Sequence, residues 1–77
     1  MTTLDQLKPG DTARVTAVHA SGPLGQRLMA LGLIDGVELR VIRHAVGGDP
    51  IEIELMGYAL SLRRDEARLV EVRRGDA

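Results

Sequence analysis

The 77-residue sequence contains no cysteine, tryptophan or phenylalanine, and its single aromatic residue is Tyr58. Without cysteine, no disulfide can stabilise the fold and no thiolate can act as a nucleophile or zinc ligand. A lone aromatic side chain cannot build the stacking platform of single-strand nucleic-acid binders or the floor of a groove for proline-rich peptides. The core therefore has to be built from the aliphatic residues that dominate the 44% hydrophobic content.

The sequence also has almost no excess of either charge, since it contains ten basic and eleven acidic residues and its net charge is −1. A nucleic-acid surface needs an excess of positive charge to release counterions. The densest basic stretch, residues 63–77, holds five arginines, but four acidic residues nearly cancel them. Nucleic acid is therefore not expected as a partner.

No long apolar run is present, so no segment is expected to span a membrane. The first residues, Met1 to Asp5, show neither the basic start nor the apolar run of a secretory signal. We therefore expect a cytoplasmic protein that meets a membrane only through a partner. Residues 1–77 are expected to form a single domain. So short a chain leaves little material for an enclosed pocket of about 300 Å³, and no catalytic or phosphate-loop motif occurs, so neither catalysis nor a required cofactor is predicted.

Alternating apolar and polar residues predict five short strands, over approximately residues 12–17, 37–42, 51–56, 59–63 and 69–72. One helix is predicted after the first strand: Ser21 or Gly22 can cap it, Pro23 suits its first turn and Gly32 its end. The inward face of this helix should carry Leu24, Leu28 and Leu31. This pattern predicts a mainly β fold, a small SH3-like five-stranded barrel, closed or nearly closed, with one short helix inserted after the first strand.

The segment 51–63 predicts a hairpin with a type II′ turn at Gly57-Tyr58. This turn sets Leu55 opposite Leu60, and the same register sets Ile53 opposite Leu62 and Glu52 opposite Arg63. Leu60 is therefore expected at the centre of the barrel.

Three stretches of the sequence resemble the FeoA family: residues 7–11 (Leu-Lys-Pro-Gly-Asp), residues 28–36 (Leu-Met-Ala-Leu-Gly-Leu-Ile-Asp-Gly), and residues 48–67, from Gly48-Asp49-Pro50 to Glu66-Ala67. They occur in order and span almost the whole chain. The resemblance implies an SH3-like barrel that serves ferrous iron transport in the cytosol. It also implies a partner, the membrane transporter FeoB with its cytosolic GTP-binding domain, and regulation of that transporter or of its GTPase as the mode of action.

Two histidines are present, His19 and His44, and the second lies where a metal site is conceivable. His44 ends a predicted strand, and the proposed pairing brings it near Asp49 and Glu52. One imidazole with one or two carboxylates can hold a divalent transition metal weakly at a surface. A full site needs three or four ligands, so the plainer interpretation, solvated loop residues, is favoured.

Partner binding is assigned to three other residues. Arg27 and Met29 lie off the leucine face of the helix, and neither has an obvious partner within the chain. Tyr58 at a tight turn is expected to be partly exposed and able to anchor a partner. The plainer alternatives are that Met29 covers the barrel end and that Tyr58 lies over Pro50 or Met56.

Two functional hypotheses follow. The first is a module that binds and regulates the ferrous iron transporter. The second is a metal-sensing module, like the barrels appended to metal-dependent repressors, in which His44 and Asp49 bind the ion. Neither hypothesis excludes a homo-oligomer, in which a second copy of the chain is a partner.

Overall fold

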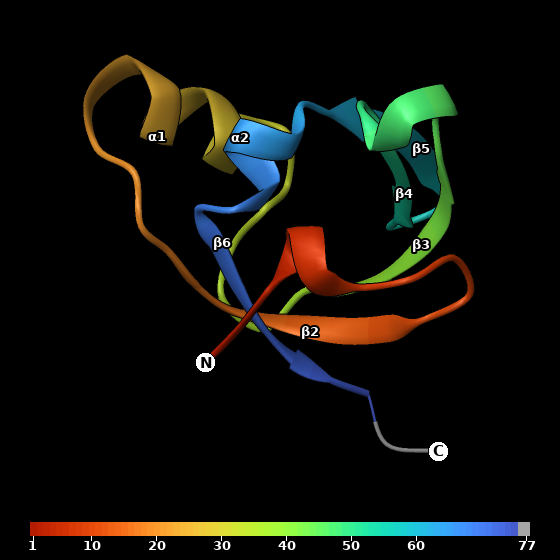
Figure 1. Cartoon of the computed structure of the whole chain (residues 1–77). Coiled ribbons are helices and arrows are strands. Elements are labelled where there is room, and N and C mark those ends of the chain that lie inside the picture. Colours follow the sequence, from red (N-terminus) through yellow and green to blue (C-terminus); the bar gives the residue numbers. More distant parts are fainter. Residues whose placement is uncertain (76–77) are drawn as a thin grey trace.

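A computed structural model of the chain describes residues 1–75 (Figure 1). Six strands form one antiparallel sheet in the order β1-β6-β2-β3-β4-β5. The elements in chain order are β1 (Thr2–Thr3), the 3-10 helix η1 (Leu4–Gln6), β2 (Thr12–Val18), α1 (Gly22–Ala30), β3 (Glu38–His44), the 3-10 helix η2 (Val46–Gly48), β4 (Ile51–Leu55), β5 (Tyr58–Leu62), α2 (Arg64–Ala67) and β6 (Val70–Arg74). Within the described part of the chain, no helix has the length and apolar character needed to cross a bilayer.

The mainly β architecture with a helix after the first long strand is confirmed, but the strand count is not. Thr2 and Thr3 pair with β6 and add a sixth strand, too short for any alternation to reveal it. The two end strands of the sheet, β1 and β5, are not paired with each other. The sheet therefore curls around its interior without closing into the predicted five-stranded barrel (Figure 1).

The core is aliphatic throughout and draws on nearly every element. Alternate residues of the strands point into it, as the period of two requires. Leu4 and Leu7 close one end from the short turn around η1, and Leu28 enters from α1. The buried hydrophobic residues are Leu4, Leu7, Ala13, Val15, Leu28, Leu33, Leu39, Val41, Ile51, Ile53, Leu55, Leu62, Ala67, Val70 and Val72.

Helix α1 begins and ends as its sequence predicts. Ser21 is the residue before the first turn, and Pro23 lies within that turn. Gly32 follows the helix with a φ of 102°, and the amides of Gly32 and Leu33 donate to the carbonyl oxygens of Met29 and Leu28. These two bonds form a Schellman motif, which ends a helix at a left-handed glycine.

The leucine face of α1 is less buried than predicted. Leu28 is fully buried, whereas Leu24 and Leu31 are half-buried. The reason is the position of the helix, which lies at one side of the curled sheet and does not cover it (Figure 1).

The predicted register of the β4–β5 hairpin is wrong by two residues. The turn is formed by Met56 and Gly57, with φ values of 50° and 83°, which is the type I′ pattern. Leu55 therefore pairs with Tyr58, and Leu60 pairs with Ile53. Because the shift is even, every side chain keeps its predicted face. The sequence interpretation placed Gly57 first in the turn, whereas it is second and Met56 adopts the other left-handed position.

Two further expectations fail with that register. Leu60 is only half-buried, because β5 is the end strand of the sheet, so it is not the centre of the core. Glu52 pairs across the sheet with Arg43 of β3, not with Arg63.

Candidate partner-binding site

A groove of about 330 Å³ lies between α1, the end of β2 and the segment 33–35. Its lining is mostly apolar, and small side chains such as Ala17 and Ala20 contribute much of it. Met29 and Ile34 line it as well, and their side chains are among the most exposed large hydrophobic groups of the chain. Such a shallow apolar recess can accept one aliphatic or aromatic side chain of another protein.

The groove exists because α1 approaches the preceding segment closely. A Cβ atom built on Gly25 would lie 2.6 Å from the carbonyl oxygen of Ala20. A larger residue at position 25 would therefore push the helix away from Ala20. Glycine at this position therefore keeps α1 close to Ala20 and the groove narrow.

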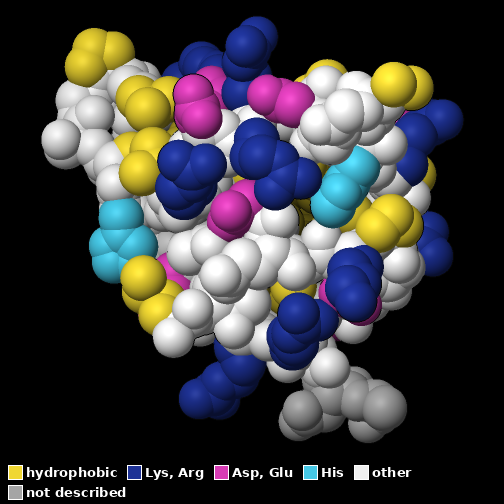
Figure 2. Space-filling view, in the orientation of Figure 1, with side chains coloured by type: hydrophobic (Ala, Val, Ile, Leu, Met, Phe, Trp, Pro, Cys, Tyr) yellow, Lys and Arg dark blue, Asp and Glu magenta, His cyan; other side chains and the backbone are white. Residues whose placement is uncertain are grey.

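The rim of the groove combines apolar and polar groups. Met29 is 63% exposed and Ile34 46% exposed. Figure 2 shows hydrophobic side chains on the surface around α1, beside interleaved acidic and basic side chains over α2. Asp35 lines the groove and forms no ion pair within residues 1–75. The groove therefore favours an apolar side chain with a basic neighbour.

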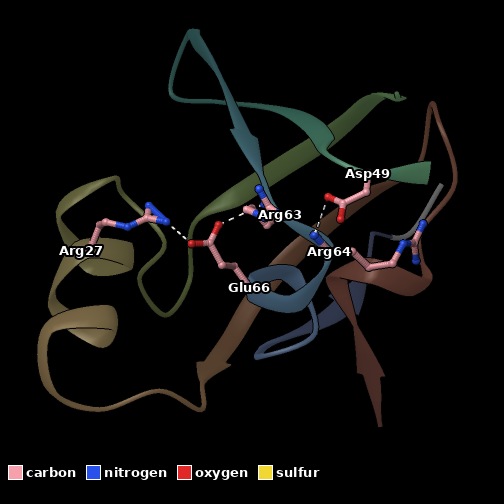
Figure 3. Close-up of polar contacts among 5 residues, drawn as sticks. All are labelled: Arg27, Asp49, Arg63, Arg64 and Glu66. Carbon is pink, nitrogen blue, oxygen red and sulfur yellow. Dashed lines mark hydrogen bonds and ion pairs between the residues drawn. The ribbon is translucent and has the colours of Figure 1, made fainter. Parts of the chain in front are cut away.

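Arg27 has a partner within the chain, contrary to expectation. Its guanidinium forms an ion pair and hydrogen bond with Glu66 of α2 (Figure 3). The other carboxylate oxygen of Glu66 accepts the backbone amide of Arg63 at 3.0 Å, and so caps the first turn of α2. The Glu66 side chain is only 14% exposed, whereas that of Arg27 is 51% exposed. Arg27 thus connects α1 to α2 while about half of its side chain stays exposed.

Tyr58 is partly exposed, as predicted. Its hydroxyl donates a hydrogen bond to the carbonyl oxygen of Leu31, at the end of α1. A Cβ atom on Gly32 would lie 2.6 Å from this hydroxyl oxygen and 2.6 Å from Met56 Cε. The tip of the β4–β5 hairpin therefore rests on the end of α1.

The residues of the predicted metal site each have a different environment in the structure. His44 pairs with buried Ile51, so its side chain shares the inner face of the sheet, whereas Glu52 is paired with Arg43 one position away on the other face. Asp49 accepts the backbone amide of Arg64 at 3.0 Å (Figure 3). Within residues 1–75, His44 Nε2 is buried without a hydrogen-bond partner. The described residues contain no group of three or more His, Cys, Asp or Glu suited to a metal ion, so metal binding by His44 and Asp49 stays a prediction.

Sequence reasoning missed Ile34, Gly25 and Glu66. Glu66 had a readable signal, because an acidic residue at the third position of a short helix commonly caps it. The groove had none, since it depends on how closely α1 approaches Ala20 in space. The other histidine, His19, lies 2.7 Å from Glu71 and joins the end of β2 to β6.

An open, curled antiparallel sheet with a helix between its first two long strands defines a small domain of SH3-like type. The chain matches the FeoA domain model over residues 2–74, and it belongs to the FeoA family. It is 33% identical over 69 residues, 90% of its length, to a protein of Porphyromonas gingivalis named Fe(2+) transport protein A/Fe(2+) transporter FeoB fusion protein. The chain spans 8% of that protein's length.

Solved structures show the same fold. The FeoA protein of Chlorobium tepidum is 45% identical, with a TM-score of 0.88 over 95% of this chain and 70% of that one. The FeoA of Stenotrophomonas maltophilia, described as a prokaryotic SH3 domain protein and complexed with zinc, is 32% identical, with a TM-score of 0.83. That alignment covers 95% of this chain and 91% of the other. The predicted resemblance to FeoA and the SH3-like class are confirmed.

Proposed function

We propose that this chain is a non-enzymatic accessory protein of ferrous iron uptake that acts in the cytoplasm by binding a FeoB-type transporter. The cytosolic GTP-binding part of the transporter is the proposed contact. The observation that carries this proposal is the related fusion protein, whose name joins Fe(2+) transport protein A to the Fe(2+) transporter FeoB in one chain. Covalent joining raises the effective concentration of one module at the other, which is useful only where the two meet.

The groove beside α1 supports this proposal as the contact surface. Met29 contributes an adaptable thioether at its rim, and methionine suits surfaces that reshape around a partner. Ile34 offers a second exposed apolar group, and Asp35 an acidic one. The proposed occupant is an apolar side chain of the transporter flanked by Lys or Arg. Arg27 would hold α1 in place through Glu66 and meet the partner with its exposed part.

The test replaces both apolar rim residues by serine, as Met29→Ser with Ile34→Ser, and measures binding to the detergent-solubilised transporter by interferometry. We expect binding at least about tenfold weaker, equivalent to about 1.4 kcal/mol. Neither side chain belongs to the buried core, so the thermal midpoint should change little.

Met56→Ser is the matched control, because Met56 is 62% exposed against 63% for Met29 but lies on the hairpin tip, outside the groove. Tyr58→Ala tests the rival surface at that tip. If the serine double variant binds like the wild type while Tyr58→Ala or Met56→Ser does not, the hairpin tip is the contact and the groove is not.

A transition-metal-sensing module is the second candidate. Two observations favour it: a 32% identical FeoA structure contains zinc, and His44 Nε2 of this chain is buried with no hydrogen-bond partner among the described residues. Zn²⁺ titration by calorimetry of the wild type and His44→Gln tests it. Binding that is lost in the variant would support the site at His44 and Asp49, and equal binding by both proteins would place any metal elsewhere.

A further inference from the structure

The outer edge of β5 is unprotected. Proteins usually guard the end strand of a sheet by making it very short or by placing charges, proline or a bulge on it. At one end of this sheet, β1 has only two residues. At the other end, β5 has five residues, Tyr58–Leu62, with no charge and no proline. Its pairing with β4 is regular over its whole length.

The register identifies which peptide groups face outward. Because the hairpin turn has two residues, Leu55 and Tyr58 form a hydrogen-bonded pair, and every second pair along the ladder does the same. The peptide groups of Ala59 and Ser61 therefore point away from β4. Within residues 1–75 neither residue forms a hydrogen bond with a loop, a turn or a side chain. Both residues are exposed.

The acidic side chains beside this edge are neutralised within the sheet. The acidic residues next to the edge, Glu52 and Glu54 of β4, are paired with Arg43 and Arg40 of β3. Ala59 and Ser61 carry the smallest side chains of β5, so they present little bulk to another strand. The edge thus presents two free amides and two free carbonyl oxygens, and no charged side chain of β5 itself repels an approaching chain.

We propose that a second copy of this chain pairs with β5 in antiparallel orientation, about a two-fold axis at Leu60. This register sets Ala59 opposite Ser61 of the second copy and Ser61 opposite Ala59 of the second copy. Each pair exchanges two backbone hydrogen bonds, so all four free groups are satisfied. Arg63 then lies opposite Gly57 of the second copy, and no like charges meet. The edge is self-complementary, as a two-fold interface requires.

One strand pair gives a small interface, below the roughly 1,200 Å² at which stable association begins, so the dimer is weak and forms at high protein concentration. An extended segment of another protein could use the same free groups by strand addition. Only pairing with a second copy, however, places residue 59 of one molecule directly opposite residue 61 of the other. The experiment is therefore built on that alignment.

Ala59→Cys and Ser61→Cys are prepared separately and mixed in equal amounts in a chain that has no other cysteine. Directly opposite residues lie at a Cα separation that suits a disulfide, whereas identical positions are offset along the strands. After mild oxidation, mass spectrometry should find the mixed dimer in excess over either homodimer by about tenfold or more. Random collision would give only twice as much. If the mixed dimer is only twice as abundant as either homodimer, the proposal is wrong.

A second readout needs no cysteine. In wild-type protein, hydrogen exchange of the Ala59 and Ser61 amides should slow as concentration rises, while that of the Leu60 amide stays constant. Ser61→Pro, which removes an outward amide and leaves the β4 ladder intact, should abolish the effect.

Amides that exchange at the same rate at every concentration contradict a second copy. If they are protected only when the transporter is added, an extended segment of the partner is the occupant and this proposal is wrong. The disulfide experiment and the concentration series use this chain alone, so the proposed function stands or falls separately.

Discussion

The side chain of Arg64 donates a hydrogen bond from Nη1 to the backbone carbonyl oxygen of Asp5, 3.1 Å away, although 59 positions separate the two residues. Nε of the same side chain donates to the carbonyl oxygen of Gly48 at 3.1 Å. The backbone amide of Arg64 donates to Asp49 at the start of α2 (Figure 3). One residue therefore connects η1, the loop containing η2, and α2, three elements that share no strand pairing.

Replacing Arg64 by methionine should lower the free energy of unfolding by about 2 kcal/mol, because two charge-assisted hydrogen bonds are lost from a half-buried position. Arg68→Met is the control, since Arg68 is an exposed neighbour in the chain and no hydrogen bond or ion pair of its side chain occurs within residues 1–75. Urea unfolding measures both. Equal losses in the two variants would show that the Arg64 contacts add nothing to stability.

Gly32→Ala should be more destabilising than Gly36→Ala. Both glycines have positive φ, 102° and 93°, so both variants are strained by about 1–2 kcal/mol. Only at Gly32 does the new Cβ meet other atoms, Tyr58 Oη and Met56 Cε, each at 2.6 Å. Met56 can move aside, but Tyr58 would have to leave its hydrogen bond to Leu31.

We therefore expect the free energy of unfolding to fall by about 1 kcal/mol more in Gly32→Ala than in Gly36→Ala, the usual contribution of one hydrogen bond. Adding Tyr58→Phe should cost almost nothing in the Gly32→Ala background but about 1 kcal/mol in the wild type. Additive effects would show that the hairpin tip and the end of α1 are independent.

Much of the fold is readable from the sequence, because local rules decide it. Pro23 and Gly32 bracket α1 as expected, and the inward face of every long strand follows the apolar alternation. Local rules also account for the turn before β2, where Gly10 has a φ of 91° and the Asp11 amide donates to the carbonyl oxygen of Lys8.

The failures occur where long-range contacts decide. The predicted register of the hairpin is wrong by two residues because side chains return to the same face every two positions, so the alternation fits both registers equally well. In addition, Met56 has a φ of 50°, which is unusual for a residue other than glycine. Arg27 looked free because Glu66 lies 39 positions away. The groove beside α1 could not be foreseen either, since it depends on the close approach of Gly25 to Ala20.

The corrected hairpin makes a prediction about two leucines on the same strand. Leu62 is fully buried opposite Ile51, whereas Leu60 is half-buried opposite Ile53. Leu62→Ala should lower the free energy of unfolding by about 3 kcal/mol, and Leu60→Ala by about 1–2 kcal/mol, since only the first leaves an enclosed cavity. Urea unfolding of the two variants gives the ratio. A larger loss at Leu60 would restore the register predicted from the sequence.

The last prediction concerns acid stability and Asp11. The backbone amide of Lys8 donates to this carboxylate at 2.8 Å, and Arg74 Nη1 lies 2.9 Å from the same oxygen. The amide hydrogen bond, followed by the Arg74 side chain, holds the pKa of Asp11 below its ordinary value of 3.8, although partial desolvation opposes this. The folded protein therefore binds the carboxyl proton less readily than the unfolded chain does.

A depressed pKa in the folded state means that the ionised carboxylate contributes stability above the unfolded pKa of 3.8 and loses it as the pH falls through the lower, folded pKa. Asp11→Asn should therefore be less stable than the wild type at pH 7, and the difference should shrink as the pH falls below 3.8. Urea unfolding at pH 7 and at a series of acid pH values measures this difference. Asp35→Asn is the control, because Asp35 forms no ion pair within residues 1–75. A difference between Asp11→Asn and the wild type that is constant over the whole series would mean that the hydrogen bonds to Asp11 act independently of its charge.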